Sequence, residues 1–434
     1  MYKVSKTQLS ILFIYLFLIV QYISSLGLMD DFYYTSLNFF LEPNLYVKFI
    51  TGDINSGGFR PFLPIQITLN NLGFYLFSHK GYFIFNLVYL FVILEIFYFT
   101  FNKLFNLNKH LFYLLFFCWP YSTDLIIHPS LQEKYIILFI SLFVYVCLNT
   151  NNKLLLACFI ALSIPLVKIQ ALTLFPIIYS VTNSKLNKNY NKSILLSSYL
   201  ISSILIIGIF YLQPKTYFNS GFQINGLIER IMNSEVNIVN LLLIFVTSIG
   251  IYYFKILNFD ILVGFIVSNI LLILFMSAYK PVGNYLNSIN IFFIIVYLLV
   301  IYNIIFDYLK SEKINISIQT FSFILFFIVL QSFTIPRFER MNSINDVITY
   351  SDEKSAGEIY YSCLEGVQYL NKIQDNNKFI HLDNYIKVSG NNIVFLSDSF
   401  ECNNIETELI NNCLKKNVIN FKYENSMRLT EYEC

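Results

Sequence analysis

The chain begins with an apolar run, LSILFIYLFLIVQYISSLGL (9–28), followed almost at once by DDFYYTSLNFFLEPNLYVKFITGDINSGGFRP (30–61). The first run has the length that the hydrocarbon core of a bilayer requires of a helix. No small-residue cleavage site follows it, so we interpret it as a retained span and not as a signal peptide. The second stretch carries an acidic pair, Asp30-Asp31, and the Arg60-Pro61 pair in one loop. We expect the rest of the chain to hold this loop over the membrane surface.

Similar apolar runs recur along most of the 434 residues. The chain is 56% hydrophobic and 18% aromatic, and only 13% of it is charged, whereas soluble domains carry about a quarter charged residues. The net charge of +2 gives no reason to expect a nucleic-acid partner. The composition therefore predicts an all-α polytopic membrane protein.

The stretch 154–181 is best read as two short membrane segments that meet near Pro165 to Gln170. Pro165 and Lys168 are poorly placed inside one continuous lipid-facing helix. The two-segment interpretation also puts the lysine-rich stretch NSKLNKNYNKS (183–193) in the cytoplasm, as the positive-inside rule requires. An interfacial or re-entrant helix is expected at 61–77. The other predicted spans lie at 9–28, 82–101, 111–127, 136–148, 194–212, 238–254, 261–278, 286–306 and 316–335.

These runs give about eleven membrane segments in a domain of residues 1–335, with an outer loop at 29–79. With the amino terminus in the cytoplasm, the tail 336–434 lies outside. There we expect a small α/β domain with strands in KFIHL and NNIVFL and helices in AGEIYYSCLEGVQYLNKI and IETELINNCLKK. The tail contains four cysteines, Cys363, Cys402, Cys413 and Cys434. They either form two disulfides in an oxidising compartment or remain free thiols. The Asn-, Ile- and Lys-rich composition favours a bacterial inner membrane.

The carboxylates of Asp30 and Asp31 are candidate catalytic groups. A carboxylate just outside a span can act as general base toward an acceptor hydroxyl. It can also hold a divalent cation together with Asp53 or Glu42. The alternative is that both residues only end the helix at the polar surface. The sequence gives no sign of an organic cofactor. A divalent cation is the one cofactor that the acidic residues of this loop could bind.

Arg60 and Lys168 are candidate phosphate-binding cations. A guanidinium can bind a phosphate through two hydrogen bonds, although Arg60 can also be an arginine at the headgroup level. An intramembrane cation such as Lys168 is a functional candidate by default. Its alternative is a structural pair with a carboxylate of a neighbouring helix, for example Asp124 or Glu133.

The stretch HPSLQEKY (128–135) forms a short outer loop that could face the same cavity. His128 or Glu133 could bind the acceptor, a metal ion or a phosphate there, beside Lys134. Glu95 lies within the second span near its cytoplasmic half, where we expect it to pair with a polar group of another helix.

Five stretches in order resemble the GT-C superfamily of polytopic glycosyltransferases, especially its protein O-mannosyltransferase-like and related bacterial families. They are the acidic pair Asp30-Asp31, GGFRPFLPI, YFIFNLVYLF with Asn86, FCWPYSTDLIIHPSLQEKY, and LVKIQALTLFP with Lys168 and Pro176. The resemblance covers about the first 180 residues. The acidic pair is Asp-Asp here and Asp-Glu in better-known members, and the carboxyl-terminal part matches no motif, so subfamily and acceptor stay open.

By this resemblance the protein would be an enzyme that transfers a sugar from a polyprenyl-phosphate donor to a glycan, lipid or protein acceptor at the outer face, with inversion. Such enzymes build cell-envelope polysaccharides, including lipopolysaccharide. Asp30 would be the general base, Asp31 would support it or bind metal, and Arg60 and Lys168 would hold the donor phosphate. The partners would be the lipid-linked donor, its acceptor and membrane lipids.

Three other functions compete with this hypothesis. An O-antigen-type polymerase or ligase would depend on outer-loop arginines more than on a carboxylate after the first span. A non-enzymatic lipid or glycan transporter would show broken helices in matching halves. A purely structural membrane protein gives no reason for acids and cations to gather in the same outer loops.

Overall fold

The computed structural model describes the helical part of the chain in eleven ranges and the tail in five. These ranges are 5–23, 42–55, 60–129, 131–149, 153–184, 192–212, 225–232, 234–254, 259–278, 289–309 and 312–340, and then 359–361, 379–381, 393–398, 414–421 and 424–433.

Helices account for all regular structure before residue 341 in the described part of the chain. They are α1 (Lys6–Tyr22), α3 (Pro43–Asn55), α4 (Leu63–Phe105), α5 (Lys109–Phe117), α6 (Tyr121–Ile127), α7 (Glu133–Asn149), α8 (Leu154–Val167), the 3-10 helix η1 (Ile169–Leu174), α9 (Phe175–Asn183), α10 (Lys192–Leu212), α11 (Leu227–Met232), α12 (Glu235–Phe254), α13 (Phe259–Ala278), α14 (Asn290–Leu309), α15 (Glu312–Val329), the π-helix η3 (Leu330–Thr334) and α16 (Ile335–Arg340).

Within the described ranges, four helical stretches are long and apolar enough to cross a membrane, namely α4, α10, α13 and the stretch Ile316–Glu339 through α15 and α16. The helices α1, α8, α12 and α14 contain shorter apolar stretches. Large apolar side chains such as Phe13 and Phe17 of α1 are about two-thirds exposed, at 65% and 64%. Such side chains suit a surface that faces lipid and not water. The chain has the architecture of a helical membrane protein, as its composition predicts.

The helix α4 consists of two arms separated by a sharp break at Phe77 and Ser78. Both residues have non-helical backbone angles, and Ser78 has a positive φ of 59°. Gly73 and Gly81 bring the two arms into backbone contact, because an added Cβ on either glycine would meet the carbonyl oxygen of the other. The first arm corresponds to the separate interfacial or re-entrant helix expected before the second span.

The run 111–127 is not one continuous span, contrary to our expectation. The helix α5 ends at Phe117, and α6 begins at Tyr121 after a turn that contains Trp119-Pro120. Proline has no N–H for a helical hydrogen bond, and its ring clashes with the preceding turn. The break predicted in 154–181 is present, because α8 ends at Val167 and Lys168 is extended, with φ −165° and ψ 147°.

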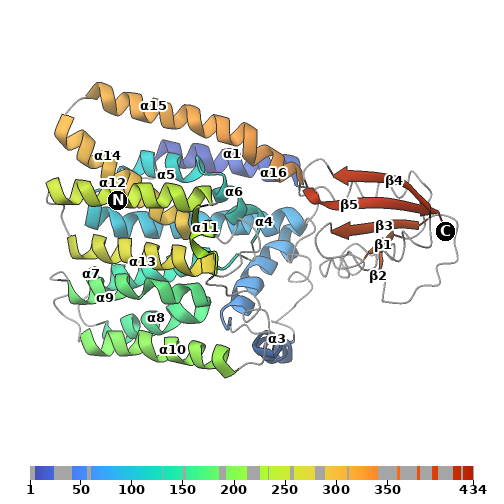
Figure 1. Ribbon diagram of the computed structural model, residues 1–434, viewed down its shortest axis with the longest axis horizontal. Coiled ribbons are helices and arrows are strands. Elements are labelled where there is room, and N and C mark those ends of the chain that lie inside the picture. The colour runs from blue at the N-terminus through green and yellow to red at the C-terminus, as the bar shows by residue number, and fades with distance from the viewer. Residues whose placement is uncertain are drawn as a thin grey trace.

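The described tail forms a five-stranded sheet of order β2-β1-β3-β5-β4, at one end of the helical part in Figure 1. β1 pairs in parallel with β2 and β3, and β5 is antiparallel to β3 and β4. The strands are β1 (Ile359–Tyr361), β2 (Phe379–His381), β3 (Ile393–Asp398), β4 (Leu414–Phe421) and β5 (Glu424–Glu433).

Two of these strands, β2 and β3, lie where the sequence predicts strands. Two predictions of helix are wrong in part, because β1 lies inside the first predicted helix and β4 begins inside the second. The remainder of both predicted helices and all four tail cysteines lie outside the described residues. Cys118 and Cys147 of the helical part are buried among apolar side chains.

Candidate functional site

A group of polar side chains lies buried where α4, α6, α7 and α8 meet. We call it the polar cluster, and it consists of Gln66, Asn70, Asn86, Pro129, Glu133, Lys134 and Lys168. Six of these seven residues are buried, and only Lys168 is partly exposed. Buried polar groups in an apolar surrounding are costly unless they are paired, so their gathering at one place calls for a specific explanation.

The ion pair between Lys168 and Glu133 is the charged centre of the polar cluster. The Nζ of Lys168 donates to the Oε1 of Glu133 at 2.5 Å, and the side chains are 21% and 0% exposed. Lys168 stands in the extended link between α8 and η1, whereas Glu133 is the first residue of α7. Of the two carboxylates considered for Lys168, the structure selects Glu133, since Asp124 pairs with Arg337 at 3.0 Å.

A second ammonium group, that of Lys134, is fully buried beside this ion pair. Its Nζ donates to the Oδ1 of Asn86 and to the carbonyl of Pro129, the latter at 3.0 Å. The amide nitrogen of Asn86 donates in turn to the carbonyls of Leu125 and Ile126, at 2.8 and 2.7 Å. The second arm of α4 is therefore joined to the end of α6 and to the start of α7.

The first arm of α4 reaches the same loop from the other side. Gln66 and Asn70 donate from their side-chain amides to the carbonyl of Pro129, at 2.5 and 3.2 Å. The two residues are four apart and so share one face of the helix. The Pro129 carbonyl therefore accepts from three side chains, and both arms of α4 are fixed around the loop between α6 and α7.

The polar cluster contains two ammonium groups and one carboxylate. Lys168 is the member of the cluster with access to solvent. The arrangement can therefore present one cation at its surface while Glu133 fixes its position.

Arg60 lies in the turn that precedes α4. Its carbonyl accepts from the N–H of Leu63 at 3.0 Å, and the next carbonyl, that of Pro61, accepts from the hydroxyl of Tyr46 in α3 at 2.9 Å. The ring of Phe62 lies 5.3 Å from the ring of Phe139, which is in the second turn of α7. The Arg60-Pro61 element is thus held between α3 and the amino-terminal part of α7, and Arg60 itself is half-buried.

The other predicted site residues are only partly described. Asp30 and Asp31 lie outside the described residues, so their position relative to Lys168 stays a prediction. His128 is half-buried and ends α6, with its N–H donating to the carbonyl of Asp124 at 2.9 Å. Glu42, which is the alternative to Asp53 as a further metal ligand beside the acidic pair, is exposed just before α3. In the ranges that the structure describes, no three His, Cys, Asp or Glu side chains come together as a metal site.

Three of the predicted residues, His128, Glu133 and Lys168, belong to one neighbourhood around the loop from α6 to α7. Sequence reasoning missed Gln66 and Asn70, although two amides four residues apart in an apolar stretch are a signal that a buried partner exists. The resemblance had singled out Asn86, but not its contact with Lys134.

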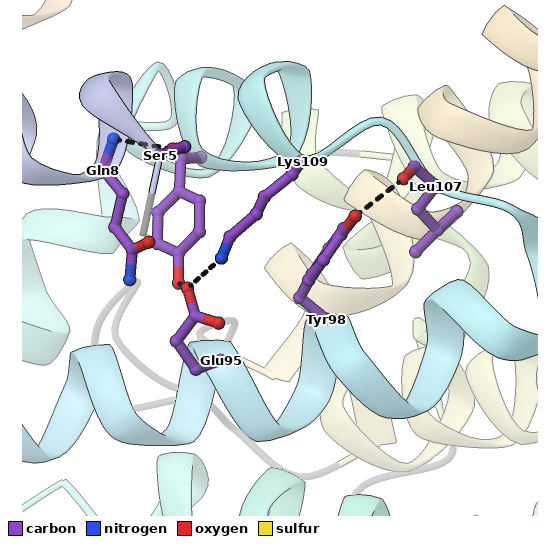
Figure 2. A network of polar contacts seen from close by, with 7 residues as sticks. Ser5, Gln8, Glu95, Tyr98, Leu107 and Lys109 are labelled. Atoms are coloured by element: carbon purple, nitrogen blue, oxygen red, sulfur yellow. Dashed lines mark hydrogen bonds and ion pairs between the residues drawn. The ribbon is translucent and has the colours of Figure 1, made fainter. Parts of the chain in front are cut away.

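A separate polar group joins α4 and α5 (Figure 2). The Oε1 of Glu95 accepts from the hydroxyl of Tyr113 at 2.6 Å and lies 3.1 Å from the Nζ of Lys109. Gln8 of α1 lies next to this group in the same view, with its backbone N–H capped by the hydroxyl of Ser5. The prediction that Glu95 pairs between helices is confirmed.

No protein-family model, no curated protein and no solved structure matches this chain. The resemblance to GT-C glycosyltransferases therefore rests on the sequence motifs alone.

Proposed function

We propose that this chain is a membrane glycosyltransferase that moves a sugar from a polyprenyl-phosphate donor to a glycan, lipid or protein acceptor at the outer face of the membrane. The observation that carries the proposal is the ammonium group of Lys168, held in a break between two apolar helices by the buried carboxylate of Glu133. A lipid-linked donor keeps its phosphate at the membrane boundary, where a cation at a helix break can meet it.

In the proposed reaction, a hydroxyl of the acceptor attacks the anomeric carbon of the donor sugar. The bond from that carbon to the phosphate oxygen breaks, and the acceptor proton passes to the carboxylate of Asp30. The polyprenyl phosphate leaves with one further negative charge, which Lys168 and Arg60 stabilise as it develops. Attack from the face opposite the leaving group inverts the anomeric configuration. Asp31 supports the base or binds a divalent cation.

The proposed membrane topology has about eleven segments, with the amino terminus in the cytoplasm and a small α/β domain outside a bacterial inner membrane. Two contacts support a shared outer side for the site and the sheet. Arg337 of α16, the last helix before the sheet, donates to the carbonyl of Pro120 at 2.5 Å and pairs with Asp124. Both partners lie within nine residues of His128, at the start of the loop that carries the polar cluster.

The proposal is tested by transfer of sugar from lipid-linked donors in membranes that contain equal amounts of each variant. Lys168→Met, Asp30→Asn and Asp31→Asn are compared with Lys103→Met, whose ammonium lies over the ring of Phe99 at 4.6 Å. We expect the loss of one group that stabilises the leaving phosphate to lower transfer about 100-fold, and Lys103→Met to leave it unchanged. Unaltered transfer in Lys168→Met would remove the proposal.

A transporter is the second candidate, because the described part contains several broken helices. Breaks occur at Phe77-Ser78, at Trp119-Pro120 and at Lys168, and discontinuous helices form the binding sites of many transporters. Proteoliposomes with donor lipid and acceptor separate the two functions. Formation of a glycosylated product supports the enzyme, whereas movement of intact donor lipid without product supports the transporter.

A further inference from the structure

Several buried polar atoms on residues close in sequence to Glu133 and Lys168 have no hydrogen-bond partner in the part of the chain that the structure describes. They are both amide atoms of Gln132, the Oε2 of Glu133, the hydroxyl of Tyr135 and the Oε1 of Gln170. Gln132 and Gln170 are each 3% exposed and Glu133 is 0% exposed. Buried polar atoms are nearly always paired in native proteins, so such a concentration points to a missing partner.

These atoms flank the ion pair on both sides in the chain. Gln132 precedes Glu133 directly, and its carbonyl accepts the first hydrogen bonds of α7 from Tyr135 and Ile136. Gln170 follows Lys168 by two residues in η1. Among the described residues, its amide nitrogen has one hydrogen-bond acceptor, the sulfur of Met276 at 3.6 Å. Thioether sulfur is a weak acceptor. The side-chain amides of both glutamines are therefore available to bind a ligand.

The balance of donors and acceptors identifies the chemical class of the partner. The set offers acceptor oxygens from Gln132, Glu133 and Gln170. Its donors are the amide of Gln132, the hydroxyl of Tyr135 and the amide of Gln170, which has only a weak sulfur acceptor. A phosphodiester has only acceptors at neutral pH and would leave the acceptor oxygens of the set unpaired. A metal cation would be repelled by the ammonium groups of Lys134 and Lys168. Hydroxyl groups both donate and accept, so a polyhydroxylated ligand satisfies the whole set.

We infer that Gln132, Glu133 and Gln170 form a subsite for sugar hydroxyls beside the ion pair. The inference deepens the proposed function, on which it rests, because it assigns these residues to the sugar of the lipid-linked donor and Lys168 to its phosphate. Glu133 links the two parts of the ligand, since Oε1 holds the ammonium group of Lys168 while Oε2 accepts from a hydroxyl. Sugar and phosphate are directly bonded in such a donor, which suits neighbouring subsites.

The test compares Gln132→Met and Gln170→Met with Gln8→Met in the purified full-length protein. Gln8 is a matched control, because it is also a buried glutamine with an unpaired Oε1 and lies in α1, next to the polar group of Figure 2. The probes are undecaprenyl phosphate alone and the same lipid bearing glucose, galactose, mannose, N-acetylglucosamine or a pentose. Affinity is measured in lipid nanodiscs, with thermal unfolding of each variant as a check of folding.

We expect each of the two site variants to lower the affinity for at least one sugar-bearing lipid about fivefold, as the loss of one hydrogen bond implies. The affinity for the bare lipid and the Tm should stay unchanged, because an unpaired amide is replaced by an apolar side chain of similar length. Equal losses for both lipids, a fall in Tm with no selective loss, or no difference from Gln8→Met would overturn the inference.

A different result would show that the proposed function, and not the sugar subsite, is wrong. The proposed function fails if bare undecaprenyl phosphate does not bind to the protein, or if Lys168→Met does not weaken that binding. The subsite is then measured with the free monosaccharides by ligand-observed NMR on the wild-type protein and Gln132→Met. Binding that is lost in Gln132→Met would support the subsite alone, and the absence of binding by every sugar would overturn it.

Discussion

Replacing Lys168 by Met should destabilise the protein strongly, because it leaves the carboxylate of Glu133 buried without a cation. The two groups are 2.5 Å apart, and the Glu133 side chain is 0% exposed. Removal of one partner of a buried ion pair costs about 3–5 kcal/mol. Since Lys168 is 21% exposed, part of the interaction is screened, and we expect a loss of about 3 kcal/mol in the free energy of unfolding.

Removing the carboxylate of Glu133 instead of the ammonium group should lower the free energy of unfolding by a smaller amount. Glu133→Leu leaves the ammonium group of Lys168 able to turn toward solvent, so we expect a loss of about 1–2 kcal/mol in the free energy of unfolding. The double variant Lys168→Met with Glu133→Leu removes both charges together. It should lie within about 1 kcal/mol of the wild type, because apolar replacement of a whole buried pair is often neutral. The two sites should therefore be strongly coupled.

The assay is reversible unfolding of the purified protein in mixed micelles, followed by the fluorescence of the single tryptophan, Trp119. Lys109→Met serves as the matched control. Its partner Glu95 is 17% exposed and keeps the hydrogen bond from Tyr113, so we expect a cost below about 1 kcal/mol. If the effects of the two single changes simply add in the double variant, the ion pair does not stabilise the fold and our reasoning about the polar cluster is wrong.

Two further predictions concern the backbone and the exit to the sheet. Gly73→Ala should cost about 2–3 kcal/mol, because the added Cβ meets the backbone of the other arm of α4. A Cβ at Gly208 would meet open space, so Gly208→Ala should be neutral or stabilising by up to about 1 kcal/mol. Equal Tm values for these two alanine variants would contradict the close contact between the two arms of α4. Arg337→Met removes the hydrogen bond to Pro120 and the pair with Asp124 and should cost about 2 kcal/mol, with partial recovery in Arg337→Lys; a thermal melt identical to that of the wild type would show that the link contributes nothing.

The sequence predicted helix breaks well where a residue is chemically unsuited to an apolar, lipid-facing helix. Pro165 and Lys168 could not both lie in a continuous lipid-facing helix, and the structure breaks the helix at Lys168. The same reasoning was not carried through for Trp119-Pro120, where the helix also ends. Both breaks follow from local chemistry, namely the missing N–H of proline and the cost of a charge in lipid.

The tail shows where local pattern is insufficient. The residues of β1 lie inside a stretch with helical periodicity, and they become a strand by pairing in parallel with β2 and β3. Parallel pairing joins segments that are distant in sequence, so it can override a local preference that the sequence displays.

By itself the sequence determined that this is a helical membrane protein and that Lys168 interrupts an apolar stretch, because apolar length and charge content fix which solvent each segment can tolerate. Only the tertiary structure decided which charges meet. Nothing in the sequence favoured Asp124 or Glu133 as the partner of Lys168. In the structure, Glu133 pairs with Lys168 and Asp124 pairs with Arg337. The residues of such a pair are far apart along the chain, and their distance depends on how whole helices pack, which no local pattern encodes.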